Sequence, residues 1–170
     1  AALSKERYMK LCCMAKKELF RNDPFSRKLI KSAGMVPVDR GGMNSSSMEN
    51  IKKRLKENWG VIIHPEGTRS EDGVFRKIKN GASTLAIETG APIIPAYVDG
   101  AYNIFPKSGK MPKLYDWKHN KKYSLSVTFG KPISPDGLTT EELTAEIESA
   151  ISVLQDENST LPQLQSHNTE

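Results

Sequence analysis

The sequence predicts an α/β fold with a mixed, mostly parallel sheet flanked by helices. Short apolar runs such as Trp59–Ile63 and Ile93–Val98 alternate with segments of helical periodicity, which is the order expected of β-α-β units. A length of 170 residues suits one domain with a substantial core. We therefore expect a single domain over residues 1–154, followed by a polar, disordered tail over residues 155–170.

The N-terminal part is expected to contribute two helical segments and a strand. Residues 4–18 have helical content, and residues 25–33 have the pattern of a short helix that Gly34 ends. Residues 35–38 are expected to form a strand near an edge of the sheet, because Pro37 has no N–H for a ladder hydrogen bond.

The next helix is expected to begin at the serines of residues 45–47, which are suitable N-caps. Met48, Ile51 and Leu55 form its apolar stripe, and its lysines, Lys52 among them, are expected to face largely toward solvent.

The remaining elements follow from the same patterns. They are a strand over 59–63, a helix over 80–89 that Gly90 ends, and strands over 93–98 and 124–129. A capping box at Thr139 and Glu142 then opens a helix. Its inward positions are expected to be Leu143, Ile147, Ile151 and Leu154.

The charge is distributed unevenly along the chain. The net charge is +5, but residues 134–170 contain acidic side chains and no lysine or arginine, so the body before them is strongly basic. A basic body suits an anionic partner such as phospholipid headgroups, a phosphorylated substrate, an acidic carrier protein or nucleic acid. Ordinary solubility charge is the simpler alternative. No nucleic-acid-binding motif is present, so no nucleic-acid partner is expected.

Two adjacent cysteines and the hydropathy of the chain limit its environment. A disulfide between Cys12 and Cys13 would be strained, so a reducing compartment and two small, apolar side chains are expected. No apolar run approaches the roughly 20 residues that span a bilayer. No signal-peptide pattern opens the chain.

The turn after the strand over 59–63 is the strongest candidate for a binding site. Glu66, Gly67, Thr68 and Arg69 place a carboxylate, a flexible glycine, a hydroxyl and a guanidinium on one turn. The guanidinium fork matches phosphate in bidentate fashion, and glycine lets backbone N–H groups approach a ligand. The alternative is a surface loop with a local Glu–Arg pair.

Two further cations are expected near the same turn. Arg40 follows the strand over 35–38, and ligands in α/β folds bind at the carboxyl ends of strands. Lys79 precedes the helix over 80–89, so it and the first N–H groups of that helix are placed to face an anion.

Four segments in order and spacing resemble the glycerolipid acyltransferase family, which includes the 1-acylglycerol-3-phosphate acyltransferases. They are Gly34–Arg40, His64–Ser70, Lys79–Gly81 and Ile94–Ala96. The resemblance runs from about Met14 to Ile133, and His64 stands where the family more often has Phe. It implies a glycerolipid acyltransferase-like domain over residues 1–154 that is incomplete at its N-terminus.

The resemblance also implies a function. The expected reaction is acyl transfer from acyl-CoA or acyl carrier protein to the hydroxyl of a lysophospholipid. The preferred acceptor is 1-acylglycerol-3-phosphate, giving phosphatidate. It implies an acceptor-phosphate site made by Arg40, Glu66, Gly67, Thr68 and Arg69, and we add Lys79 to the substrate-binding residues. Glu66 is expected to orient an arginine or to accept hydrogen bonds from backbone donors. No metal or organic cofactor is implied.

The catalytic motif of the family is missing from this sequence. That motif is His-x-x-x-x-Asp, in which the histidine is the general base and the aspartate orients it. Five positions beyond His64 stands Arg69, and five beyond His119 stands Ser124, while the chain ends soon after His167. No catalytic residue is therefore assigned in this chain.

Three explanations are open at this point. The chain is a fragment whose dyad lies upstream of Ala1, or a relative that binds lipid without chemistry, or an enzyme in which His64 is the base. We prefer the first, and we expect His64 to fill the Phe position as a partly buried side chain. The isolated chain is expected to be inactive, and its parent to act at the cytoplasmic face of a membrane, as a peripheral protein or through an anchor in a missing segment.

Residues 101–123 combine aromatic side chains with lysines, including Tyr115, Trp117, Lys118 and Lys121. This mixture is typical of a membrane interface and also of stacking on nucleic acid, and a plain exposed loop is the default. Given the resemblance, a membrane surface or an acidic carrier protein is the preferred partner of this segment.

Overall fold

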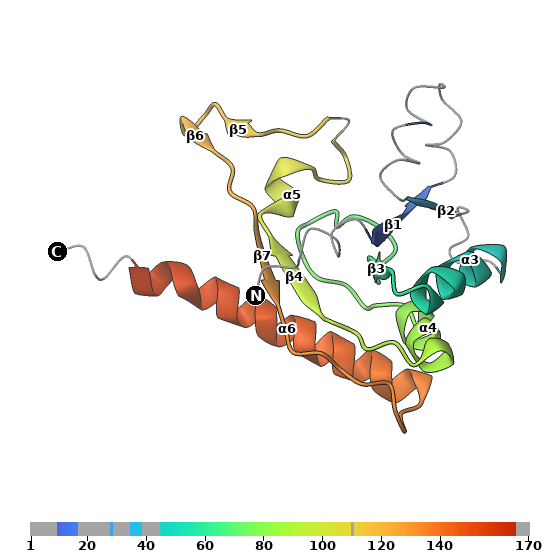
Figure 1. The fold of residues 1–170 in the computed structure, drawn as a ribbon. Helices are drawn as coiled ribbons and strands as arrows, with labels where there is room; N and C mark the ends of the chain where they lie inside the picture. Colours follow the sequence, from blue (N-terminus) through green and yellow to red (C-terminus); the bar gives the residue numbers. More distant parts are fainter. Residues whose placement is uncertain (1–9, 17–27, 29–34, 39–44, 110, 166–170) are drawn as a thin grey trace.

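The computed structural model describes residues 10–16, 28, 35–38, 45–109 and 111–165, and the structural statements that follow concern those residues (Figure 1). The elements, in chain order, are β1 (Leu11–Lys16), β2 (Val36–Val38), α3 (Ser45–Lys56), β3 (Gly60–Ile62), α4 (Gly81–Thr89), β4 (Ala96–Asp99), α5 (Ala101–Ile104), β5 (Tyr115–Asp116), β6 (Lys121–Lys122), β7 (Ser126–Phe129) and α6 (Thr140–Gln165).

The described strands form three small sheets, one parallel and two antiparallel, so the single mixed, mostly parallel sheet predicted from the sequence is not present among the described residues. The strand order in the first sheet is β2-β1-β3, and both pairs are parallel, with Met14 opposite Val36 and Cys12 opposite Val61. Strands β4 and β7 pair in antiparallel fashion, and β5 and β6 form a separate antiparallel hairpin. Together with the helices, this arrangement confirms the α/β prediction.

The prediction of helical content over residues 4–18 is wrong for β1, which is the central strand of the parallel sheet. Leu, Met, Ala and Lys all favour helices, so local propensity pointed away from a strand. Strand β1 pairs with β2 and with β3, both distant in sequence, and Cys12 is only 1% exposed. Tertiary pairing and burial therefore override the local preference.

The strand predicted over 35–38 is confirmed as β2, and it lies at an edge of the described three-stranded sheet, as Pro37 led us to expect. The helix predicted over 25–33 lies outside the described residues apart from Lys28, which is helical.

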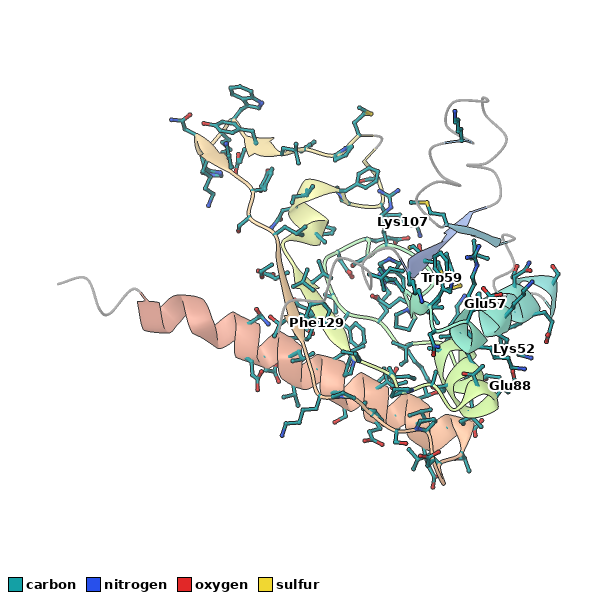
Figure 2. The ribbon with its side chains drawn as sticks, viewed as in Figure 1. Lys52, Glu57, Trp59, Glu88, Lys107 and Phe129 are labelled. Atoms are coloured by element: carbon teal, nitrogen blue, oxygen red, sulfur yellow. The ribbon has the colours of Figure 1, made fainter. Side chains whose placement is uncertain are left out.

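Helix α3 covers the parallel sheet and contacts α4, so the predicted helix is confirmed. Ile51 of its apolar stripe is fully buried, with 0% exposure. The prediction of a largely solvated Lys52 is wrong: its side chain is 23% exposed, and its Nζ lies 2.9 Å from Glu88 of α4 and 2.8 Å from Glu49 (Figure 2). This bridge ties α3 to α4.

Helix α6 runs along β4, β7 and α4 (Figure 1). Its predicted inward positions are confirmed, with exposed fractions of 0%, 3%, 7% and 7% for Leu143, Ile147, Ile151 and Leu154. The boundary predicted at residue 154 is too early, because α6 continues to Gln165. Asn158 donates hydrogen bonds to Thr128 Oγ1 of β7 (2.9 Å) and to the Leu154 carbonyl (2.8 Å), and these polar contacts hold the helix beyond its apolar stripe.

The core consists of two clusters that meet at α4. Leu85 of α4 packs with Cys12, Val36 and Ile51, on the side of the parallel sheet. The adjacent Ala86 belongs to the second cluster. The other buried members of that cluster are Ile78, Ile133, Leu143, Ile147 and Ile151. Helix α4 therefore joins the parallel sheet to the layer formed by α6.

The apolar side chains of β7 face away from α6. Val127 and Phe129 are 48% and 69% exposed, whereas Thr128 between them is bonded to Asn158. Phe129 is visible beside β4 in Figure 2. The alternation predicted for this strand is present, but its apolar face is not part of the core of the described residues.

Both thiols are free, with Cys12 buried and Cys13 partly buried, as the adjacent pair led us to expect. Burial raises the pKa of the Cys12 thiol, which keeps it in the neutral form. Among the described helices, none combines the length and hydropathy needed to cross a membrane.

The capping box at Thr139 gives a testable pH dependence. Glu142 Oε2 accepts hydrogen bonds from the Thr139 N–H (2.9 Å) and hydroxyl (2.8 Å), and these contacts lower the pKa of the carboxyl. A carboxylate with a lowered pKa stabilises the fold above its unfolded pKa of about 4.3, and the effect is lost as the pH falls through the folded value. The urea concentration at the midpoint of unfolding should therefore decrease as the pH is lowered from about 5 to about 3.

Part of this fall should disappear in Glu142→Gln, which keeps the box geometry and cannot titrate. Thr139→Val should also flatten the dependence of the urea midpoint on pH. This variant lacks the hydroxyl that donates to Glu142 Oε2 and accepts from the backbone N–H of Glu142. Profiles parallel to that of the wild type in both variants would contradict this role.

Candidate phosphate-binding site

The turn that follows β3 is fixed by its own backbone. The Gly67 N–H donates to the His64 carbonyl at 3.0 Å, and Gly67 adopts φ 72°, a left-handed conformation that favours glycine. Glu66 Oε2 accepts a hydrogen bond from the backbone N–H of Arg76 at 3.1 Å. The carboxylate thus binds a backbone donor, one of the two roles expected for it, and it holds the loop over residues 66–76 closed.

Lys79 lies directly over this turn. Its backbone N–H donates to the Pro65 carbonyl at 2.9 Å, and its Nζ would be 3.1 Å from a Cβ placed on Gly67. The preceding residue is anchored as well, because the Ile78 N–H donates to Glu148 Oε1 of α6 at 2.8 Å. Two segments twelve or more residues apart in sequence therefore bring an ammonium group to a glycine turn.

Arg69 takes part in a different set of contacts from those predicted. Its guanidinium donates to the carbonyl of Pro106 at 2.9 Å and, more weakly, to those of Phe105 and Lys107 at 3.4 Å. It also stacks on the Phe105 ring, with Cζ 4.0 Å from the ring centroid. The local Glu–Arg pair considered from the sequence is not among these contacts, since Glu66 is bonded to the Arg76 backbone.

Further contacts join the same two segments. The Tyr102 hydroxyl donates to the Glu71 carbonyl at 3.0 Å, and Lys107 forms an ion pair with the Glu71 carboxylate. The Lys107 bond lowers the pKa of Glu71. With Arg69, these contacts clamp the turn to residues 102–107.

The other predicted site residues are placed as follows. Thr68 is exposed, and its hydroxyl lies 3.4 Å from the Arg69 carbonyl. Arg40 lies outside the described residues, so its convergence on the turn remains a prediction. His64 is exposed rather than partly buried, so the expectation that it fills an aromatic slot is wrong for the described residues. It lies two residues beyond Ile62, the last residue of β3.

One histidine–carboxylate pair was not predicted from the sequence. His119 Nδ1 lies 2.7 Å from Asp116 Oδ2, and Asp116 Oδ1 also accepts from the backbone N–H groups of Lys118 and His119. The order Asp-x-x-His is the reverse of the family motif, so a search for that motif passes over it. The Asp116 carboxylate caps the turn between β5 and β6, and the His119 ring is exposed. We therefore interpret this pair as one that stabilises the turn.

Within the described part of the chain, no group of three or more His, Cys, Asp and Glu side chains is placed to hold a metal ion. The cation placed at the turn itself is the ammonium group of Lys79, which is suited to an anion, while the guanidinium of Arg69 is bonded to the carbonyls of residues 105–107.

Comparison with known proteins identifies the family. The Acyltransferase family model matches residues 1–99. The 1-acyl-sn-glycerol-3-phosphate acyltransferase of Bacillus subtilis (strain 168) is 38% identical over 120 residues, which cover 71% of this chain and 53% of that protein. The enzyme of the same name from Borreliella burgdorferi is 32% identical over 97 residues, covering 56% of this chain and 38% of that protein.

A solved structure agrees at the level of the fold. The crystal structure of the 1-acyl-sn-glycerophosphate acyltransferase of Thermotoga maritima matches with a TM-score of 0.69 and 24% identity, covering 88% of this chain and 57% of that chain. The chain belongs to the glycerolipid acyltransferase family, as its motifs led us to expect. It spans about half the length of the Bacillus subtilis relative.

Proposed function

We propose that the protein carrying this chain transfers a fatty acyl group to the free hydroxyl of 1-acylglycerol-3-phosphate, giving phosphatidate. The acyl donor in this proposal is acyl-CoA or acylated acyl carrier protein. The observation that carries the proposal is the position of Lys79 over the Gly67 turn, in a chain that belongs to an acyltransferase family.

The acceptor's phosphate is the group that this turn is suited to bind. Lys79 supplies a compact positive charge, and the N-terminus of α4 follows it at Gly81. Arg69 is bonded to neutral carbonyls, and a phosphate offers charge-assisted hydrogen bonds that are about twice as strong. A bound phosphate is therefore expected to draw the guanidinium toward the turn. Because Gly67 has no Cβ, the Lys79 side chain lies close against the turn.

The reaction itself needs a base. The acceptor hydroxyl loses its proton as its oxygen attacks the thioester carbonyl, the carbon–sulfur bond breaks, and the thiol leaves with a proton. In the family this base is the histidine of His-x-x-x-x-Asp, a motif that this sequence does not contain. We propose that the residues of this chain bind and position the acceptor, which lowers the entropic barrier to attack.

A non-catalytic lipid- or phosphate-binding relative is the second candidate, and the missing dyad is the observation that favours it. The coding sequence upstream of Ala1 discriminates the two, because only the enzyme requires a His-x-x-x-x-Asp motif there. For the enzyme, we also propose action at the cytoplasmic face of a membrane, where its acceptor and product reside.

The test is transfer of labelled acyl groups to 1-acylglycerol-3-phosphate by the protein as the organism makes it, with each donor offered separately. Phosphatidate formation with either donor supports the enzyme. Saturable binding of the acceptor with no transfer from either donor would support the binding module, and the 170-residue chain alone is expected to behave in that second way.

A further inference from the structure

Residues 101–123, called the excursion below, leave the molecule between β4 and β7 and return to the same place. Val98 of β4 lies opposite Val127 of β7, so the two ends of the excursion are neighbours. Gly100 adopts φ 80°, and a Cβ there would lie 2.1 Å from the Ser124 carbonyl oxygen, so the two ends are in close contact. Figure 1 shows β5 and β6 at the far end of the excursion, away from α6 and the parallel sheet.

The far end carries the most exposed apolar side chains of the described residues. Met111, Leu114 and Trp117 are 75%, 71% and 85% exposed, more than any other large hydrophobic side chain described. Tyr115 lies against Trp117, with ring centroids 4.6 Å apart. Indole and phenol rings favour the headgroup level of a bilayer, where one end is apolar and the other is wet.

Positive charge surrounds these apolar groups. The far end has four exposed lysines, none of which forms an ion pair within the described part of the chain: Lys113, Lys118, Lys121 and Lys122. Asp116 is the one acidic residue in the excursion, and it is bonded to His119. The excursion therefore combines unpaired cations with exposed apolar side chains, which is complementary to a bilayer that contains anionic lipid.

The near end of the excursion is fixed to the candidate phosphate site. Arg69 binds the Pro106 carbonyl, Tyr102 binds the Glu71 carbonyl, and Lys107 pairs with Glu71. A membrane bound by the far end would thus be held at a fixed position relative to the Gly67 turn.

We propose that the excursion is a membrane-docking element for anionic bilayers, which inserts Trp117, Leu114 and Met111 at the headgroup level. It deepens the proposed function, since a lysophospholipid acceptor is itself a membrane component. The clamp at Arg69 and Glu71 then sets the acceptor turn beside the surface from which the acceptor comes.

Tryptophan fluorescence of the full chain tests the proposal directly. The chain has two tryptophans, and Trp59→Phe leaves Trp117 as the reporter. With vesicles of phosphatidylcholine and phosphatidylglycerol we expect a blue shift and saturable binding. With phosphatidylcholine alone, the affinity should be at least about tenfold lower. The vesicles contain neither donor nor acceptor, so a failure of acyl transfer leaves this result unaffected.

Two quadruple variants separate docking from overall charge. In the first, glutamine replaces Lys113, Lys118, Lys121 and Lys122. In the matched control it replaces four exposed lysines elsewhere, Lys53, Lys56, Lys77 and Lys131. We expect a loss of vesicle affinity of about 100-fold in the first variant and less than about threefold in the control. Equal losses, or no blue shift of Trp117, would overturn the proposal.

A separate pair of variants tests the contribution of exposed apolar side chains to vesicle binding. Trp117→Ala in the otherwise unaltered chain should weaken vesicle binding by about tenfold in a flotation assay. Val153→Ala, at an exposed position on α6, should leave it unchanged. A Trp117 shift caused by a soluble acidic acyl carrier protein, with none caused by vesicles, would assign the excursion to a protein partner and overturn the membrane assignment.

Discussion

Replacing Arg69 with alanine is expected to raise the KM for 1-acylglycerol-3-phosphate by about 100-fold, because a charge-assisted bidentate contact worth about 3 kcal/mol is lost. The KM for the acyl donor should change by less than about twofold, since the donor does not depend on the acceptor's phosphate in this account. The measurement is steady-state kinetics with each substrate varied in turn, in the protein as the organism makes it.

Arg69→Lys is the informative companion variant. It keeps the charge but loses the planar fork, so an intermediate KM is expected. Arg69 also holds the carbonyls of residues 105–107, and circular dichroism and urea midpoints of both variants must therefore be compared with those of the wild type. An equal loss of affinity for donor and acceptor would count against the phosphate assignment.

Truncating Leu143 to alanine is expected to give the largest loss of stability among single substitutions in α6. The side chain is fully buried, with 0% exposure, and packs in the cluster that also contains Ile147 and Ala86. Removing it leaves a cavity and costs about 3 kcal/mol, out of a typical total of about 5 to 15 kcal/mol for a domain. The urea midpoint should fall in proportion, with an unchanged slope.

Val153 provides the control on the same helix. It is 52% exposed, so Val153→Ala should change the free energy of unfolding by less than about 0.5 kcal/mol. Leu143→Met should cost less than about 1.5 kcal/mol, because it keeps most of the volume. Similar midpoints for Leu143→Ala and Val153→Ala would show that the α6 cluster is not the core of the domain.

Some helices were predictable from their own sequence, because it contains both the residues that cap the helix and the apolar residues that it buries. The helix that opens at Thr139 has a capping box, and every one of its expected inward positions is buried. The helix that ends at Gly90 is confirmed in the same way, with Gly90 at φ 68° as its C-cap. In both cases the information lies within a few residues of the element.

Strand β1 was not predictable in this way, since its structure depends on partners far along the chain. It lies between β2 and β3, and a strand buried in a parallel sheet has no alternation that distinguishes it from a helix. The end of α6 was missed for a related reason, because Asn158 binds Thr128 through polar contacts.

The candidate site was predictable in composition and only partly in arrangement. The Gly67 turn and Lys79 are close together, as the four family-like segments implied. The partners of Arg69 are carbonyls in residues 105–107, and backbone acceptors leave no trace in side-chain sequence. The clamp between Glu71 and Lys107 joins residues that no local pattern connects.

In the proposed function, the Gly67 turn and Lys79 hold the phosphate of the acceptor. The most direct measurement is the ratio of kcat/KM for 1-acylglycerol-3-phosphate to that for 1-acylglycerol, which lacks the phosphate. Lys79→Gln should lower this ratio by at least about tenfold, because kcat/KM should fall for 1-acylglycerol-3-phosphate and not for 1-acylglycerol. Lys77→Gln should leave the ratio unchanged. An equal effect of Lys79→Gln on both acceptors, or no effect on either, would contradict the claim.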